Sequence, residues 1–327
     1  MNYIGSKKKL ANTIKDIILN SVGSDQKLVF CDLFAGTGAI SEVMKGEFKN
    51  LIANDMEYYS YITLKAKLNC KPLGWQEHLK KLNNLKGVEG FISESYGEGG
   101  SDGRLYFSKS NAMKIDSIRL EIERLFRRKE INKDSYYYLI ASLIESADKV
   151  ANTASVFGAY LKKLKASALK ELDLVGLNVK CKGKEPKIFN EDSNKLIENI
   201  HGDVLYLDPP YNTRQYGANY HLLTTIAKYD RFTPKGKTGL REYQKSNWCY
   251  KKRVANELEE LIKKAHFRHI FLSYNNEGLL KSSEIKEILS KYGTYSFKEW
   301  EYDKFQSQKD AGNSKVTEFL HILKKDR

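Results

Sequence analysis

Cysteine and proline are both scarce in this chain, with four and five among its 327 residues. The cysteines show neither close pairing nor the spacing of a zinc site, so we expect reduced thiols. No stretch approaches the roughly 18 consecutive apolar residues of a membrane span, and the N-terminus lacks the apolar core of a secretion signal. These absences argue against a disulfide-stapled secreted domain and a membrane protein, and they predict a cytoplasmic location.

Two nucleotide-binding motifs are missing as well. Residues 28–38 read as a strand and a glycine turn, with a helix starting near Ala39. A dinucleotide-binding fingerprint needs a third glycine where Ser41 stands, and the turn has no P-loop lysine. Asp32, which precedes the turn, would repel phosphate but can bind the ammonium group of an amino acid. This pattern favours S-adenosylmethionine over NAD or ATP.

Positive charge is what the chain has in excess, with a formal net charge of +14. Its hydrophobic content of 41% suits a folded globular protein, and its length allows one large or two modest domains. A basic protein suits a polyanionic partner, although the same charge can serve solubility alone. No cluster of residues resembles a metal site, so we expect no metal.

One short apolar strand organises the chain. Residues 204–207 are followed by Asp208, Pro209, Pro210 and Tyr211, the candidate catalytic residues. Open α/β sheets bind ligands at the carboxyl ends of their strands, and the two prolines end the strand and stiffen the turn. The Asp208 carboxylate and the Pro209 carbonyl can accept the two protons of a planar amine, while Tyr211 can stack on its ring.

This Asp-Pro-Pro-Tyr sequence resembles the catalytic motif of the adenine-N6 DNA methyltransferases, and the patterns Pro-Tyr-Asn, Arg-Gln-Tyr and Asn-Tyr-His in residues 210–221 resemble one branch of them. Residues 2–10 resemble the cofactor-covering segment that comes first in the Dam-like (D12 class, alpha group) enzymes. Strand patterns occur near residues 28, 50, 187, 203, 269, 295 and 316. We therefore expect an α/β fold with the seven-stranded, mostly parallel, Rossmann-like sheet of an S-adenosylmethionine-dependent methyltransferase, helices on both faces and a helical insertion.

The cofactor residues follow partly from position and partly from that resemblance. Asp55 ends the second strand, where a carboxylate suits a ribose diol. Gly5 allows close backbone approach, and Lys7 lies near the start of the first helix, which we expect Ser6 to cap. By resemblance, Asp192 lies at the adenine end of the cofactor. The full expected set is Tyr3, Gly5, Lys7, Asp32, Phe34, Gly36, Gly38, Asp55, Asp192 and Ser193.

The character of the sequence changes between residues 71 and 186. Residues 93–103 read as a mobile loop, and amphipathic helices follow over residues 115–126 and from Asp134. We expect a discontinuous catalytic domain of residues 1–70 and 187–327, and a helical insertion of residues 71–186 that recognises the DNA target. Residues 104–133 hold nine basic and four acidic residues, and residues 228–253 hold nine and two. The expected phosphate contacts in these two regions are Arg124, Arg127, Arg128, Lys251, Lys252 and Arg253.

Together these features predict a site-specific adenine-N6 methyltransferase acting on an adenine flipped out of double-stranded DNA. The resemblance also implies a restriction–modification system with a cognate restriction endonuclease, and we expect a monomer. Two alternatives stay open. A methyltransferase acting on ribosomal RNA bases shares the sheet and related motifs, but the segment ahead of the glycine turn and the basic insertion argue against it. A DNA-binding protein that has lost catalysis is disfavoured by intact Asp32, Asp55, Asp208 and Tyr211.

Overall fold

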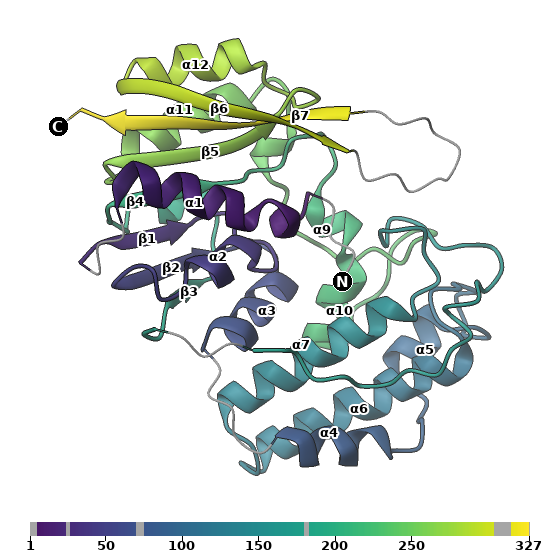
Figure 1. The fold of residues 1–327 in the computed structure, drawn as a ribbon. Coiled ribbons are helices and arrows are strands. Elements are labelled where there is room, and N and C mark those ends of the chain that lie inside the picture. Colours follow the sequence, from purple (N-terminus) through teal and green to yellow (C-terminus); the bar gives the residue numbers. More distant parts are fainter. Residues whose placement is uncertain (1–4, 24–26, 70–74, 180–182, 304–314, 327) are drawn as a thin grey trace. The chain divides into compact units, whose positions relative to one another are not determined.

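The computed structural model of the chain describes residues 5–23, 27–69, 75–179, 183–303 and 315–326. Contacts between residues divide the chain into two compact units, each assembled from separate stretches of sequence (Figure 1). We call them the sheet unit and the helical unit. The sheet unit comprises Gly5–Met56, Lys182–Gln215 and Lys245–Arg327, and the described residues of the helical unit lie within Glu57–Cys181 and Tyr216–Gln244.

The sheet unit is built on seven strands in the order β3-β2-β1-β4-β5-β7-β6. Strands β1 to β5 run parallel, whereas β7 pairs antiparallel with both β5 and β6. The central strands are short apolar runs with buried side chains, as expected of a parallel sheet. This arrangement confirms the predicted fold class. The strands are β1 (Val29–Asp32), β2 (Asn50–Asn54), β3 (Lys187–Phe189), β4 (Val204–Leu207), β5 (His269–Asn275), β6 (Gly293–Asp303) and β7 (Lys315–Lys325).

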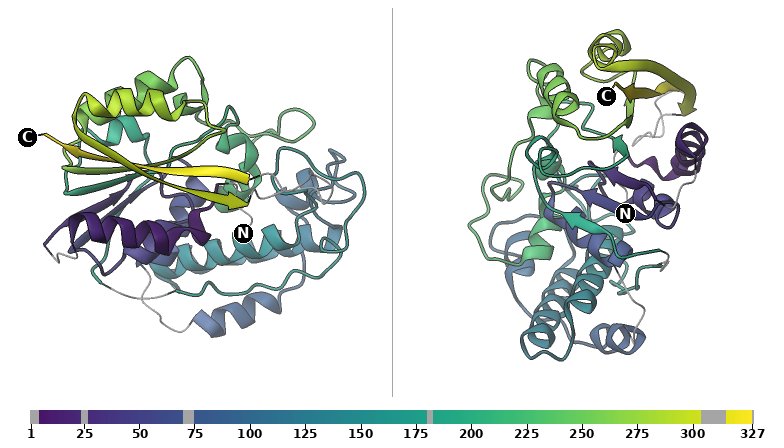
Figure 2. Two further views of the ribbon diagram at one scale, coloured as in Figure 1. Left: turned by 45° about the horizontal axis from the view of Figure 1, so that its top comes forward. Right: turned by 90° about the vertical axis from the view of Figure 1, so that its left-hand side faces the viewer.

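Helices lie on both faces of this sheet, as predicted (Figure 2). One face carries α1 (Ala11–Val22) and α2 (Ala39–Met44), and the other carries α8 (Ser193–Leu196), α11 (Val254–Lys264) and α12 (Ser282–Ser290). Leu258 of α11 and Ile285 of α12 belong to the same buried cluster as Leu205 and Leu272 of the sheet. Apolar burial of this kind is the main force that holds helices to a sheet.

The start of the chain differs in detail from the prediction. The hydroxyl of Ser6 accepts a hydrogen bond from the Lys8 amide and caps a single 3-10 turn, η1 (Lys7–Lys9). Leu10 then takes the N-cap position of α1, without a side-chain hydrogen bond. Ser6 therefore caps η1 rather than the amphipathic helix, because the chain makes one tight turn before that helix begins. A second 3-10 turn, η2 (Asn247–Cys249), precedes α11.

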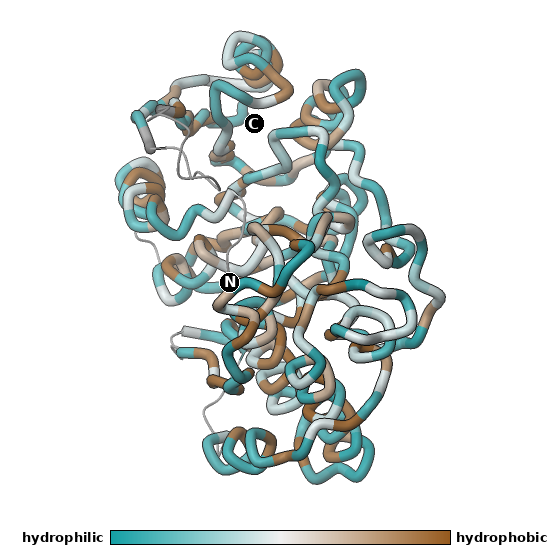
Figure 3. Tube along the Cα trace, turned by 90° about the vertical axis from the view of Figure 1, so that its right-hand side faces the viewer, coloured by the Kyte–Doolittle hydropathy of each residue, from teal (hydrophilic) through white to brown (hydrophobic). Residues whose placement is uncertain are grey.

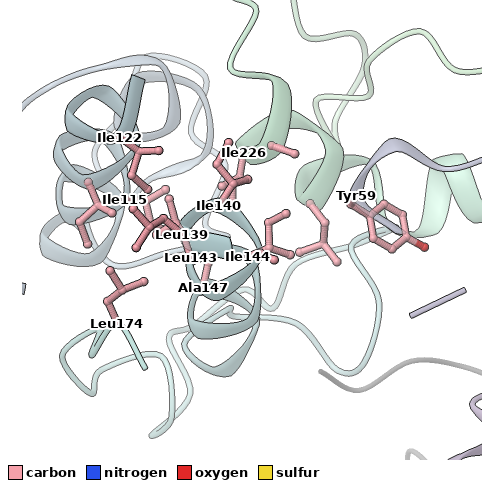
Figure 4. Packing of buried hydrophobic residues seen from close by; sticks show 14 of the residues in the cluster. Tyr59, Ile115, Ile122, Leu139, Ile140, Leu143, Ile144, Ala147, Leu174 and Ile226 are labelled. Atoms are coloured by element: carbon pink, nitrogen blue, oxygen red, sulfur yellow. The ribbon is translucent and has the colours of Figure 1, made fainter. Parts of the chain in front are cut away.

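In its described residues, the helical unit packs seven helices around one apolar cluster. In Figure 4, Ile115 and Ile122 of α6 face Leu139 and Leu143 of α7, with Ile226 of α10 alongside. In Figure 3, hydrophobic and hydrophilic residues both occur along each helix, as expected where a helix buries one side and exposes the other. The helices are α3 (Tyr58–Asn69), α4 (Trp75–Asn83), α5 (Phe91–Tyr96), α6 (Lys109–Arg127), α7 (Lys133–Lys149), α9 (Tyr216–Asn219) and α10 (His221–Lys228).

The contacts assign more of the chain to the helical unit than the expected insertion of residues 71–186. Helix α3 packs against α7 and α10, and residues 216–244 belong to the same unit. The expected mobile loop over residues 93–103 is wrong in part, because α5 covers its beginning. The buried carboxylate of Asp116 accepts hydrogen bonds from the amides of Ile92 and Ser93 at 2.9 and 2.8 Å, which stabilises the first turn of α5.

Within the described ranges, no helix is both long and apolar enough to cross a membrane.

Candidate active site

The parallel strands bring four predicted segments to one edge of the sheet unit. The order β3-β2-β1-β4 aligns the carboxyl ends of these strands. The glycine turn follows β1, Asp55 follows β2, Asp192 and Ser193 follow β3, and Asp208 follows β4. Open α/β sheets bind their ligands at this edge, so the candidate cofactor and catalytic residues meet where the fold favours a site.

Two asparagines, which sequence reasoning missed, fasten these segments together. The Asn54 side chain donates to the carbonyls of Leu33 and Glu191 at 3.1 Å each and accepts from the Glu191 amide at 3.0 Å. The Asn190 side chain donates to the carbonyls of Asp55 and Met56 at 2.8 and 2.9 Å. The segments after β1, β2 and β3 are therefore held by side chains as well as by the sheet. A polar residue at the end of an apolar strand was the available signal.

The glycine turn takes a backbone shape that favours glycine. Gly36 and Gly38 have φ angles of 52° and 88°, in the left-handed region. The Gly36 amide donates to Asp55 Oδ2 at 2.8 Å. Asp55 thus braces the turn in addition to any ligand that it binds, and a carboxylate oxygen can accept more than one hydrogen bond.

Asp32 is a buried carboxylate with one oxygen unsatisfied. Its Oδ2 accepts from the Ser41 hydroxyl at 2.6 Å and the Ser41 amide at 3.1 Å. Its Oδ1 is buried and has no hydrogen-bond partner among the described residues. Burial, aided by the nearby Asp208, raises the pKa of Asp32 to about 7. Because an unpaired buried acceptor is costly, this oxygen fits a ligand that brings a positively charged donor, such as an amino-acid ammonium group.

Aromatic rings and a capped helix lie next to the turn. The Phe34 ring meets the Trp248 ring edge to face at 5.1 Å, and the Trp248 indole donates to Asn194 Oδ1 at 3.0 Å. Asp192 Oδ1 accepts from the amides of Asn194 and Lys195, so it caps α8. Ser193 is buried beside it. This region therefore offers an apolar wall next to polar groups, as a nucleobase would require.

Asp208 lies at the end of β4 with two partners. The Tyr211 hydroxyl donates a short hydrogen bond to Asp208 Oδ1, and Lys7 Nζ lies 3.2 Å from the same oxygen. Lys7 Nζ also lies 4.6 Å from the centre of the Tyr211 ring. Burial raises the pKa of Asp208, while the Lys7 charge and the Tyr211 hydrogen bond oppose that rise. Lys7, which we expected among the cofactor residues, thus contacts the candidate catalytic carboxylate.

The rest of the Asp-Pro-Pro-Tyr turn is firmly held. Pro209 is buried, and nothing in the described ranges donates a hydrogen bond to its carbonyl. The Tyr211 ring packs against Tyr274 with centroids 4.7 Å apart, and the Tyr211 carbonyl accepts from the Leu279 amide at 2.9 Å. The turn therefore presents an acceptor and a fixed ring beside Asp208.

Glu318 on β7 is a further member of the site that sequence reasoning missed. Its Oε2 lies 3.6 Å from Lys7 Nζ, and burial raises the pKa of its carboxyl while Lys7 opposes the rise. The signal was its phase in the strand, since Val316, Glu318 and Leu320 alternate on the buried face. Because Glu318 is far from the Asp-Pro-Pro-Tyr motif along the chain, the sequence did not indicate that it belongs to the same site.

The remaining predicted residues differ in their surroundings. Arg124 pairs with Glu121 and Glu130, and Arg127 pairs with Glu123. In the sheet unit, Lys251, Lys252 and Arg253 are exposed just before α11. Arg128 is also exposed, Gly5 has a φ angle of 76°, and Tyr3 lies outside the described residues. In the part of the chain that is described, no group of three His, Cys, Asp or Glu side chains could hold a metal ion.

Comparison with known proteins agrees with this geometry. The model of the D12 class N6 adenine-specific DNA methyltransferases matches residues 3–288. The chain is 50% identical to type II methyltransferase M.NlaIII of Neisseria lactamica over 99% of both chains. It is 41% identical to type II methyltransferase M.FokI of Planomicrobium okeanokoites, over all of this chain and 53% of that one. It is also 38% identical to type II methyltransferase M.CviAII of Paramecium bursaria Chlorella virus 1, over 99% of this chain and 98% of that one.

The family model thus spans the glycine turn, the strand-end carboxylates and the Asp-Pro-Pro-Tyr turn, and two of these relatives match over almost their whole length. The chain therefore belongs to the D12 class of N6 adenine-specific DNA methyltransferases, with S-adenosylmethionine as its cofactor and DNA as its substrate.

Proposed function

We propose that the edge of the sheet unit at Asp208 methylates N6 of a single adenine flipped out of duplex DNA, within a specific sequence. The observation that carries this proposal is the partly buried Asp208 carboxylate at the end of β4, which accepts a hydrogen bond from the Tyr211 hydroxyl and lies beside the Lys7 ammonium. The amine of a paired adenine is inaccessible inside the duplex, so the base has to leave the stack before it can reach this carboxylate.

Asp208 and the Pro209 carbonyl accept hydrogen bonds from the two amino N–H groups of the target adenine, and one of these protons is lost from N6 once the methyl group has been transferred. When bound, S-adenosylmethionine supplies a methyl group already activated by its sulfonium. The adenine amine is a poor nucleophile because its lone pair is delocalised into the ring. Hydrogen bonds to two fixed acceptors favour a pyramidal nitrogen with an available lone pair, and they stabilise the positive charge that develops on it.

Tyr211 stacks on the flipped adenine, and Pro210 holds its backbone. The ring can do this without reorganisation because its hydroxyl is bound to Asp208 and its carbonyl to the Leu279 amide. Such fixing lowers the cost of aligning the two reacting groups.

The cofactor residues have separable roles in this proposal. Asp32 Oδ1 binds the ammonium group, because this buried oxygen has no hydrogen-bond partner in the described structure. Gly36 and Gly38 allow close approach of the backbone, and Asp55 binds the ribose while it braces the turn. The adenine end lies against Phe34, near the backbone of α8. Tyr3, Gly5, Lys7, Asp192 and Ser193 complete the proposed set.

DNA recognition is proposed for the helical unit, together with exposed basic residues of both units. Residues 71–186, the expected insertion, remain the proposed target-recognition domain. Lys251, Lys252 and Arg253 are better candidates for phosphate contacts than Arg124 and Arg127, whose charges are balanced by neighbouring glutamates.

The relatives' shared name, type II methyltransferase, supports a place in a restriction–modification system. We propose that a cognate restriction endonuclease acts at the same DNA sequence, that the methyltransferase works as a monomer, and that it acts in the cytoplasm.

The test is transfer of a labelled methyl group from S-adenosylmethionine to duplex DNA and, separately, to ribosomal RNA. The proposal predicts N6-methyladenine in the DNA, confined to one sequence context, and no label in the RNA. Label in the RNA alone would replace this function with the ribosomal alternative, and no label in either would favour a protein that binds DNA without catalysis.

A further inference from the structure

Lys7 is a buried cation shared by two carboxylates from distant parts of the sheet unit. Its ammonium lies 3.2 Å from Asp208 Oδ1 and 3.6 Å from Glu318 Oε2. The exposed fractions of the Lys7, Asp208 and Glu318 side chains are 4%, 17% and 9%. The three groups come from η1, the end of β4 and β7, so the fold alone brings them together.

The contact between Lys7 and Asp208 conflicts with the chemistry proposed for Asp208. The Lys7 ammonium contacts Asp208 Oδ1, whereas the proposed chemistry requires the Asp208 carboxylate to accept a hydrogen bond from the target amine. Its positive charge also lies close to where positive charge develops on the adenine nitrogen, and poor screening in a buried site strengthens that repulsion. Transfer is therefore favoured when Lys7 gives up Asp208.

Lys7 cannot simply move into water, because its side chain is almost fully buried. A buried ammonium without a partner is strongly unfavourable. Glu318 is the second carboxylate within reach, and its Oε2 makes no hydrogen bond within the described structure. Glu318 also sits on a paired strand, opposite Asn275 of β5 and Trp300 of β6, which fixes its position.

We propose that Glu318 is a positioning residue that holds the Lys7 ammonium when the adenine amine takes its place on Asp208. Glu318 does not touch the reacting atoms and acts through Lys7. The inference rests on the proposed catalytic role of Asp208. The residue lies beyond residues 3–288, the part of the chain that the family model matches.

The first test is Glu318→Gln, which removes the charge and keeps the size. Single-turnover transfer of a labelled methyl group to duplex DNA should slow about tenfold or more, because Lys7 stays on Asp208. The dissociation constant of S-adenosylmethionine, measured by calorimetry, should not change. Glu299→Gln is the matched control, since it removes the same charge from an exposed position on the neighbouring strand β6, and it should transfer methyl at the wild-type rate.

The second test asks whether Glu318 acts through Lys7. In a Lys7→Met background there is no ammonium to hold, so Glu318→Gln should slow transfer much less than it does in the wild type. Equal slowing in both backgrounds would overturn the proposal, as would a wild-type rate in the single variant. Glu318→Asp keeps the charge with a shorter reach and should give an intermediate rate, which answers the question if the Gln variant does not fold.

One further variant in the same assay separates failure of this inference from failure of the proposed function. Asp208→Asn should be almost inactive. If it is inactive while Glu318→Gln transfers methyl normally, only the role of Glu318 is wrong. If Asp208→Asn is itself active, the proposed catalytic site is wrong and the inference falls with it.

Discussion

The two units differ in how completely their buried charged side chains are hydrogen-bonded. In the helical unit, Arg104 donates to three backbone carbonyls and a carboxylate, and Asp116 accepts from two amides and a tyrosine hydroxyl. Among the described residues of the sheet unit, Asp32 keeps one buried oxygen without a hydrogen bond, and so does Glu318. Lys7 is divided between two carboxylates.

This difference distinguishes charged side chains that stabilise the fold from charged side chains that are available to bind a ligand. A buried charge whose hydrogen bonds are all made stabilises one backbone arrangement. A buried charge with a missing partner destabilises the free protein, and such groups in native structures require an explanation. In the sheet unit they gather at the edge where the candidate cofactor and catalytic residues meet, so the bound ligands supply what the free protein lacks.

The largest expected effect is at Asp208 in the sheet unit. Asp208→Ala should reduce turnover about a hundredfold or more, because it removes a charged hydrogen-bond acceptor from the target amine. The affinity for S-adenosylmethionine should stay near that of the wild type, since Asp32 and Asp55 are unchanged. Labelled-methyl transfer and calorimetry on the same preparation measure both quantities. Normal turnover would remove the central catalytic assignment.

Arg104 in the helical unit should show the opposite pattern. Arg104→Met removes hydrogen bonds to three backbone carbonyls and a carboxylate, so the free energy of unfolding should fall by about 3 kcal/mol. Affinity for S-adenosylmethionine should be unchanged below the melting temperature. Arg124→Met is the control: this arginine forms ion pairs at a partly exposed position, where a much smaller decrease is expected. Similar decreases in chemical denaturation of the two variants would break the comparison.

The pH dependence of cofactor binding sharpens the comparison further. The pKa of Asp32 is raised to about 7 by burial, so its carboxylate is partly protonated at neutral pH. An ammonium ligand binds the ionised form, so affinity should rise severalfold from about pH 6 to about pH 7.5. The folding stability of the free protein should change with pH in the opposite direction to cofactor affinity. The stability linked to the raised pKa of Asp32 is present in acid and is lost as pH rises through about 7. Asp32→Asn should remove both trends, which calorimetry and thermal melts over this range can follow.

The smallest expected effect concerns exposed charge. Neutralising Lys251, Lys252 and Arg253 to Gln should weaken DNA binding similarly for all sequences and flatten its salt dependence, by about 0.9 in the logarithmic slope for each phosphate that the protein no longer neutralises. The matched triple change at Arg124, Arg127 and Arg128 should flatten it less, because glutamates already pair with two of these arginines. A larger change in the second variant would reverse this ranking.

Local patterns in the sequence were enough to predict the seven strands, the glycine turn and the position of Asp208. Each of these features lies within a run of about ten residues, where apolar content, glycine and proline act directly on the backbone. The Asn54 contact with Glu191 joins residues 137 apart, and Lys7 meets Glu318 from the other end of the chain. Such contacts depend on the packed fold, so the sequence can indicate that a polar residue is buried but not which distant residue it contacts.

The helical unit shows a second limit of local patterns. Residues 216–244 follow the catalytic motif directly, yet they join a unit formed mainly by residues 57–181. Helix α5 was missed because glycine and serine are common in its neighbourhood, whereas a buried carboxylate, Asp116, stabilises its first turn from a distance. The composition of a segment indicates its local conformational preference, and contacts with distant parts of the fold can override that preference.

The most direct test compares one buried carboxylate from each unit. Asp32→Asn and Asp116→Asn are melted at about pH 7.5, where most of the Asp32 carboxyl is ionised, with and without saturating S-adenosylmethionine. Asp116→Asn should melt below the wild type and gain the full wild-type increment from the cofactor, since its oxygens serve the fold. Asp32→Asn should melt at or above the wild type and gain a much smaller increment, because its unpaired oxygen serves the ligand. A full increment in Asp32→Asn, or an absent increment in Asp116→Asn, would contradict the assignment of unsatisfied buried charge to ligand binding.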